Sequence, residues 1–89
     1  MKYLFVYGAA LTRDAAKAAI DASPLVKTWR YDMPNSFYLV SDFSAQKLYE
    51  DIAPRFAGKK RFLIAEINET NRQGLLPKDT WAFLNANNG

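Results

Sequence analysis

The chain of 89 residues is long enough for one small domain, and with 49% hydrophobic and 15% aromatic residues it is typical of a folded globular protein. It has no cysteine and no histidine, which excludes disulfides, thiolate or imidazole catalysis and the commonest transition-metal ligands. The net charge of +3 permits contact with nucleic acid without requiring it. The first apolar stretch is too short for a signal peptide, and none approaches the ~20 residues of a membrane helix, so we expect a cytoplasmic protein.

The first expected element is a strand over residues 2–7, "KYLFVY". Both of its faces are apolar, which indicates a central place in a sheet. An alanine-rich helix follows, with Thr12 as its N-cap. We expect this helix to end at Ser23, because the residue before Pro24 resists helical geometry.

A hairpin and a second helix are expected next. The strands are residues 26–32 and 36–42, and residues 33–35, "MPN", form the tight turn between them. Ser44 caps an amphipathic helix with apolar residues at helical spacing. Pro54 should bend this helix or restart it as a final turn, because proline lacks an N–H group.

The last elements are a strand and a short helix. Gly58 closes the second helix in left-handed geometry, and the fourth strand is "RFLIAEI", residues 61–67. The terminal helix lies within residues 76–84, with Pro77 in its first turn and Trp81 and Leu84 docking on the body. We expect residues 85–89 to fray.

The order strand, helix, strand, strand, helix, strand predicts an α+β sandwich of the ferredoxin-like βαββαβ type. The single domain covers residues 1–89, with a core over 1–68 and a C-terminal appendage over 69–89. In this topology the first and third strands are central, and the fourth lies at the edge beside the first. A bare apolar edge invites aggregation, so we expect the C-terminal segment or a second subunit to cover the fourth strand.

Several segments carry a resemblance that spans nearly the whole chain. They are "SFYLVSDFSAQKLYEDIAP", "RFLIAEI" and "GLLPKDTWAFL", with Ser36-Phe37, Ser44-Ala45, Ala53-Pro54 and Leu76-Pro77-Lys78-Asp79 as their most specific pieces. The chain resembles the small bacterial SinR-like proteins. These are similar to the smaller of the two universal CRISPR adaptation proteins, a ferredoxin-fold family related to the VapD toxins. The resemblance implies a homodimer in which sheet surfaces or edges of two protomers meet.

In the resembled family, nuclease activity is associated with an aspartate at the end of the first strand. The matching position here is Gly8, which follows Tyr7 and offers no carboxylate for a divalent cation. We therefore expect a non-catalytic module with no metal or cofactor. The alternative is a metal-dependent nuclease that uses other acids, for which the candidates are Asp14, Asp32, Asp42, Glu66 and Asp79.

The aromatic residues of the first strand, on one face by alternation, predict an interface. We assign the dimer contact to Tyr3, Phe5, Tyr7, Tyr38, Phe62, Ile64 and Glu66. The alternative is an RNA-binding sheet face on which the same rings stack against bases. For Glu66, edge protection or an ion pair across the dimer is the leading interpretation.

The basic residues near the end of the second helix form a candidate phosphate site. The residues assigned to nucleic-acid contact are Lys17, Arg30, Arg55, Lys59, Lys60 and Arg61. The alternative is that these cations favour the helix C-terminus and keep the domain soluble.

Overall fold

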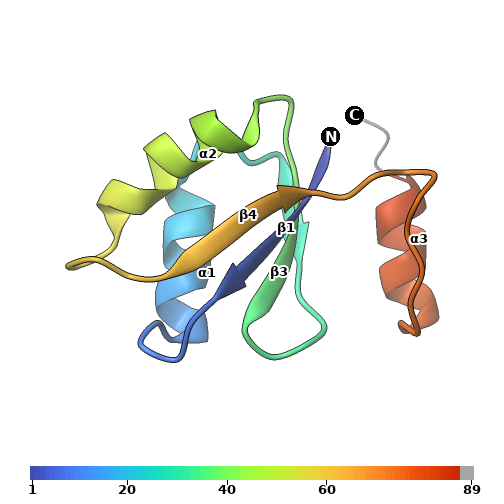
Figure 1. Ribbon diagram of the computed structural model, residues 1–89, viewed down its shortest axis with the longest axis horizontal. Helices are drawn as coiled ribbons and strands as arrows, with labels where there is room; N and C mark the ends of the chain where they lie inside the picture. Colours follow the sequence, from blue (N-terminus) through green and yellow to red (C-terminus); the bar gives the residue numbers. More distant parts are fainter. Residues whose placement is uncertain (87–89) are drawn as a thin grey trace.

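The computed structural model describes residues 1–86, which form a small α+β domain with one four-stranded antiparallel sheet and three α-helices. The elements in chain order are β1 (Lys2–Tyr7), α1 (Arg13–Ala22), β2 (Thr28–Arg30), β3 (Ser36–Val40), α2 (Ala45–Ile52), the 3₁₀ turn η1 (Ala53–Arg55), β4 (Phe62–Glu66) and α3 (Lys78–Ala86). Figure 1 shows α1 and α2 on one side of the sheet and α3 on the other. No helix in this part of the chain is long and apolar enough to cross a membrane.

The strands lie in the order β2-β3-β1-β4. The predicted central positions of β1 and β3, and the predicted place of β4 at the edge beside β1, are confirmed. All three strand pairs are antiparallel, and Phe5 lies opposite both Phe37 of β3 and Ile64 of β4. Along β1, the side chains of odd-numbered residues lie on one face of the sheet and those of even-numbered residues lie on the other.

Local signals placed the helix ends correctly. The Thr12 hydroxyl accepts a hydrogen bond from the Ala15 amide at 3.1 Å, and α1 ends before Ser23. The Ser44 hydroxyl accepts from the Lys47 amide at 3.2 Å. Each cap satisfies one of the amides that a helix leaves unpaired at its N-terminus.

The end of the second helix also follows the prediction. The α-helix stops at Ile52, and Pro54 lies in the 3₁₀ turn that continues it. Gly58 takes the predicted left-handed geometry, with a φ of 73°. Its predicted role in closing the helix is wrong, because η1 ends at Arg55 with Phe56 as its C-cap, and Gly58 lies in the loop beyond.

The predicted strand at 26–32 is too long, because β2 pairs with β3 over Thr28–Arg30 only. Tyr31 leaves the ladder, and its ring packs edge-on against Phe37 with 5.7 Å between ring centroids. The connection to β3 is consequently wider than a tight turn. It ends at Asn35, which has a φ of 62°.

The main core lies between the sheet and helices α1 and α2. Its buried members are Tyr3, Phe5, Tyr7, Leu11, Ala16, Ala19, Ile20, Phe37, Leu39, Leu48 and Ile52. The rings of Phe5 and Phe62 stack at 5.2 Å within this layer. The aromatic residues of β1 thus pack inside a single chain.

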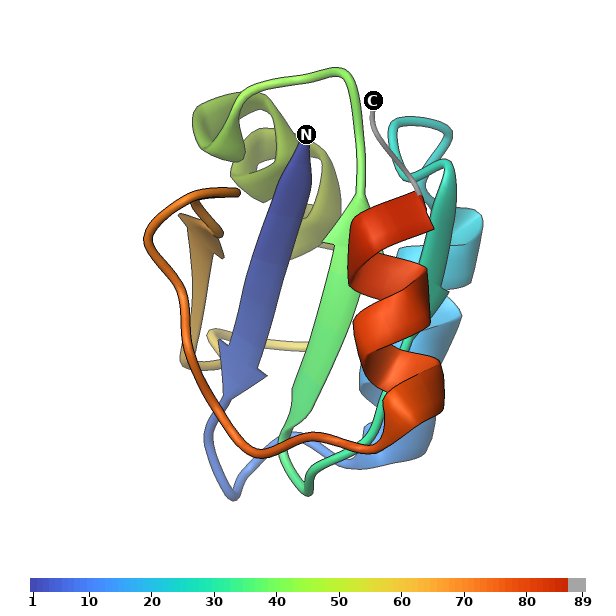
Figure 2. The same ribbon diagram turned by 90° about the vertical axis from the view of Figure 1, so that its right-hand side faces the viewer.

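The opposite face is covered in part by the C-terminal segment (Figure 2). Leu84 of α3 is buried, which confirms its docking, and Trp81 is partly buried. The Arg30 guanidinium donates to the Thr80 hydroxyl at 3.1 Å and ties α3 to β2. The expected fraying is wrong for residues 85 and 86, which belong to α3, and residues 87–89 lie outside the described part of the chain.

Candidate interaction surface

The outer edge of β4 is uncovered. β4 pairs with β1 alone, and in Figure 1 it crosses the front of the molecule with no other segment in front of it. The chain beyond Glu66 turns away to the face that α3 covers, as Figure 2 also shows. We expected either the C-terminal segment or a second subunit to cover this strand. The C-terminal segment through residue 86 does not cover it.

Hydrogen bonding at both ends of β4 fixes which of its backbone groups are free. The Gly8 amide donates to the Arg61 carbonyl at 3.0 Å, and the Ile67 amide donates to the Lys2 carbonyl at 2.8 Å. Because bonding alternates along an antiparallel strand, the odd-numbered residues from 61 to 67 bond to β1. The even-numbered residues Phe62, Ile64 and Glu66 therefore point their N–H and C=O groups away from the sheet.

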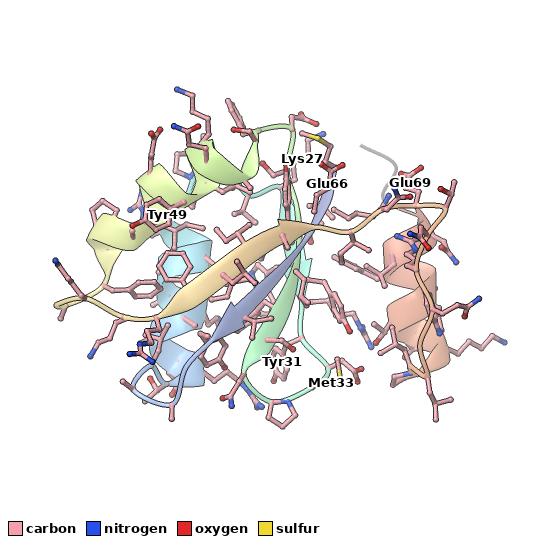
Figure 3. All side chains as sticks on the ribbon, viewed as in Figure 1. Lys27, Tyr31, Met33, Tyr49, Glu66 and Glu69 are labelled. Carbon is pink, nitrogen blue, oxygen red and sulfur yellow. The ribbon has the colours of Figure 1, made fainter. Side chains whose placement is uncertain are left out.

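Apolar side chains flank this edge on both faces. Leu63 is 63% exposed and Ala65 is also exposed, both on the face of α3. On the helix face, Phe62 is half-buried and its ring centroid lies 5.5 Å from that of Tyr49, whose side chain is 55% exposed. The position of Tyr49 above β4 is visible in Figure 3.

The two ends of β4 carry opposite charge. The basic loop, Lys59–Arg61, precedes the strand, whereas Glu66 ends it and Glu69 follows. Figure 3 shows Glu66 at the C-terminal end of β4 and Glu69 farther along the segment that leaves the strand. Glu69 contacts the Lys2 ammonium at 3.3 Å, and Glu66 has no cationic partner within 4.0 Å among residues 1–86.

Glu66 acts on a buried neighbour. It faces Tyr3 across the β1–β4 ladder, and burial, followed by the negative charge of Glu66, raises the pKa of the Tyr3 hydroxyl. This hydroxyl donates a hydrogen bond of 2.7 Å to the Phe43 carbonyl. Tyr3 is thus a structural hydrogen-bond donor inside the domain.

The cations of the basic loop have no ion-pair partner in the described chain. Lys59, Lys60 and Arg61 have no carboxylate within 4.0 Å, whereas Arg55 is bound to Asp51 at 3.2 Å. Beside the loop lies a groove of about 500 Å³ between α1 and η1, with an alanine-rich lining that includes Arg55 and Lys60. Lys59, Lys60 and Arg61 are consecutive, and Lys60 and Arg55 line the same groove.

Lys17 and Arg30 do not join this group. The Lys17 ammonium lies 3.0 Å from Asp21 and 5.4 Å from the centre of the Trp29 ring, near β2 at the opposite edge of the sheet from β4. Arg30 is held by Thr80 under α3. The six predicted cations therefore do not form one surface, because the fold separates the edges to which they belong.

The aromatic part of the predicted dimer interface needs a correction. Tyr3, Phe5 and Tyr7 are at most 5% exposed beneath α1 and α2, and Tyr38 is 4% exposed on the other face. Tyr38 cannot join the other three, because it lies opposite Leu4. These rings have no free face for a second copy or for a stacked base, which leaves Phe62, Ile64 and Glu66 as accessible members of the predicted set.

The edge also contains residues that the sequence interpretation did not single out. Leu63 and Ala65 are the alternate positions of the same predicted strand, and Tyr49 is an apolar residue of the predicted helix face. Because side chains alternate between the two faces of a strand, the predicted edge position of this strand was enough to identify Leu63 and Ala65.

The candidate acids do not form a cation site in the described chain. No group of three or more histidine, cysteine, aspartate or glutamate side chains there is placed to hold a metal ion. Asp42 forms an ion pair with Lys27 at 2.9 Å, and Gly8 offers only backbone groups at the end of β1. Comparison with family models, curated proteins and solved structures found no match to this chain.

Proposed function

We propose that this protein is a homodimeric, non-catalytic module of the ferredoxin-like class that associates through the outer edge of β4. One observation carries the proposal: β4 has an unpaired backbone edge with exposed apolar side chains, and the C-terminal segment through residue 86 leaves it uncovered. The resemblance to the SinR-like and CRISPR adaptation proteins, which implies a homodimer, supports the same conclusion.

The physical reason for association is the state of this edge in water. Unpaired strand edges are templates for further strand pairing, and natural proteins protect them with charge, bulges or covering segments. Within Phe62–Glu66 the only charged residue is the last one. Fully burying a side chain such as that of Leu63 contributes about 1.5–3 kcal/mol, so a second copy lowers the free energy of this surface.

The assignment to the ferredoxin-like class is supported by the positions of the strands. β1 and β3 are central, β4 lies beside β1, and α1 and α2 pack on one face. This is the arrangement expected when two βαβ units interlock. Helix α3 on the opposite face is an addition to that plan.

A second role, contact with nucleic-acid phosphates, is favoured by the basic loop. Its three consecutive cations have no acidic partner in the described chain, and backbone phosphates are bound mainly through such charges. We propose no cleavage step, because Gly8 has no side-chain oxygen that could bind a cation.

Sedimentation equilibrium tests the proposed association. The unmodified chain should sediment with the mass of a dimer, and Leu63→Lys should shift it to the monomer mass by placing a charge on the interface. Leu75→Lys is the matched control, because Leu75 is 99% exposed and lies outside β4. A monomer mass for the unmodified chain at high concentration, or equal effects of the two variants, would overturn the proposal.

A further inference from the structure

We propose that the second copy aligns its β4 antiparallel to this one about a two-fold axis at Ile64, so that the two sheets join into one. This inference rests on the proposed self-association and adds the geometry of the contact. It assigns a specific register, a specific pair of contacting side chains and a specific match of charges.

The register follows from the free backbone groups. Phe62, Ile64 and Glu66 direct their N–H and C=O groups outward, as the hydrogen bonds of Arg61 and Ile67 to β1 establish. With the axis at Ile64, Phe62 lies opposite the partner's Glu66, and Ile64 lies opposite the partner's Ile64. Each of these residues exchanges two hydrogen bonds with its counterpart, which satisfies every outward group of β4.

Other registers satisfy fewer groups. A shift by two residues leaves outward groups of one strand end without a counterpart. A shift by one residue places outward groups opposite groups that are already bonded to β1, and it also exchanges the two faces of the sheet. The self-complementary register is the one that uses the whole strand.

Side-chain sizes fit the same register. Leu63 lies opposite the partner's Ala65 on the face of α3, and Ala65 lies opposite the partner's Leu63. Such non-hydrogen-bonded pairs bring side chains close, so a large residue beside a small one packs without crowding. The exposed side chain of Leu63 is thereby removed from water.

Charge selects the antiparallel direction. The basic loop precedes β4, whereas Glu66 is its last residue and Glu69 follows in the segment beyond. Antiparallel pairing places the basic loop of each copy beside the acidic end of the other. Parallel pairing would place like charges together, which opposes association.

Disulfide trapping tests this geometry in a chain that has no cysteine of its own. The double variant Leu63→Cys/Ala65→Cys should form a disulfide-linked dimer under mild oxidation, because the Cα atoms of a non-hydrogen-bonded pair lie about 4.5 Å apart, within the disulfide range. Leu63→Cys alone should lose this crosslinking, since the register does not place Leu63 opposite the partner's Leu63. Leu75→Cys is the control, because its rate of crosslinking measures random collisions between exposed cysteines.

The outcomes separate the register from the association. If the double variant sediments as a dimer but crosslinks no faster than Leu75→Cys, the register is wrong and self-association stands. If Leu63→Cys alone crosslinks as fast as the double variant, the axis at Ile64 is wrong. If the unmodified chain and the double variant under reducing conditions both sediment as monomers, both proposals fail.

Discussion

The Gly8 amide donates a hydrogen bond of 3.0 Å to the carbonyl oxygen of Arg61. This bond ties the end of β1 to the basic loop. It also sets the phase of hydrogen bonding along β4 and thereby decides which backbone groups of the edge are free. Gly8 is thus the anchor of the proposed interaction surface.

Gly8→Asp should fold with a free energy of unfolding within about 0.5 kcal/mol of the unmodified chain. A Cβ atom at Gly8 would lie 3.6 Å from the Cβ atom of Arg61, an ordinary contact, and the backbone there is not in the left-handed region. Urea unfolding measures the change. A loss of several kcal/mol would mean that glycine is required at this position for steric reasons.

Lys60→Gln should weaken binding to a DNA duplex and make its salt dependence shallower by about 0.9 in the slope of log K against log salt, as expected for one lost phosphate contact. Lys17→Gln removes the same charge from the β2 side of the domain and should leave that slope unchanged. Fluorescence anisotropy over a salt series measures both. Equal slopes for the two variants would contradict a localised phosphate site.

Glu69→Lys should raise the dimer dissociation constant several-fold, because it places a cation beside the partner's basic loop. Lys59→Glu in the same chain should recover most of that loss, since the pair of charges is then exchanged in both copies. Sedimentation at low salt gives the constants. Failure of the second change to recover affinity would argue against the antiparallel direction. Because Glu69 also contacts Lys2, an unfolding measurement on each variant serves as the control.

Phe5→Ala should cost about 3–5 kcal/mol of folding stability, because the Phe5 ring is fully buried among the aromatic residues of the core. Leu63→Ala should leave the monomer fold nearly unchanged and weaken association instead. Urea unfolding and sedimentation of both variants separate the core from the edge. Intact folding of Phe5→Ala as a monomer would return Phe5 to the candidate interface residues.

Stability should fall at alkaline pH partly through Tyr3. Burial and the charge of Glu66 raise the pKa of its hydroxyl above the ordinary value of about 10. The protonated form is therefore favoured by folding, and its contribution is complete below pH 10 and is lost as the pH rises through the folded-state pKa. Tyr3→Phe should flatten the decline of unfolding free energy above pH 10. An unchanged pH profile would contradict this assignment.

Much of the local structure follows from short-range signals. Thr12 and Ser44 cap helices because their hydroxyls bond amides three residues away, and Gly58 takes a positive φ because glycine has no Cβ atom to oppose it. Pro54 ends the regular helix for want of an N–H group. These interactions are decided within a few residues, so the sequence alone predicts them.

The predicted functional residues were less complete, because their exposure depends on distant segments. Alternation correctly groups Tyr3 with Phe5, but it cannot tell whether helices cover that face. Tyr38 was assigned to the same group, and the β1–β3 register places it on the other face. Lys17 and the basic loop are separated by the width of the sheet, which no local pattern records.

By itself the sequence determined the order of elements, the helix caps and the placement of an apolar strand at the edge of the sheet. Only the tertiary structure decided that α1 and α2 bury the aromatic face of β1, and that α3 covers the opposite face and leaves β4 open. The reason is physical: caps and turns depend on bonds between near neighbours, whereas burial depends on which segments far apart in the chain meet.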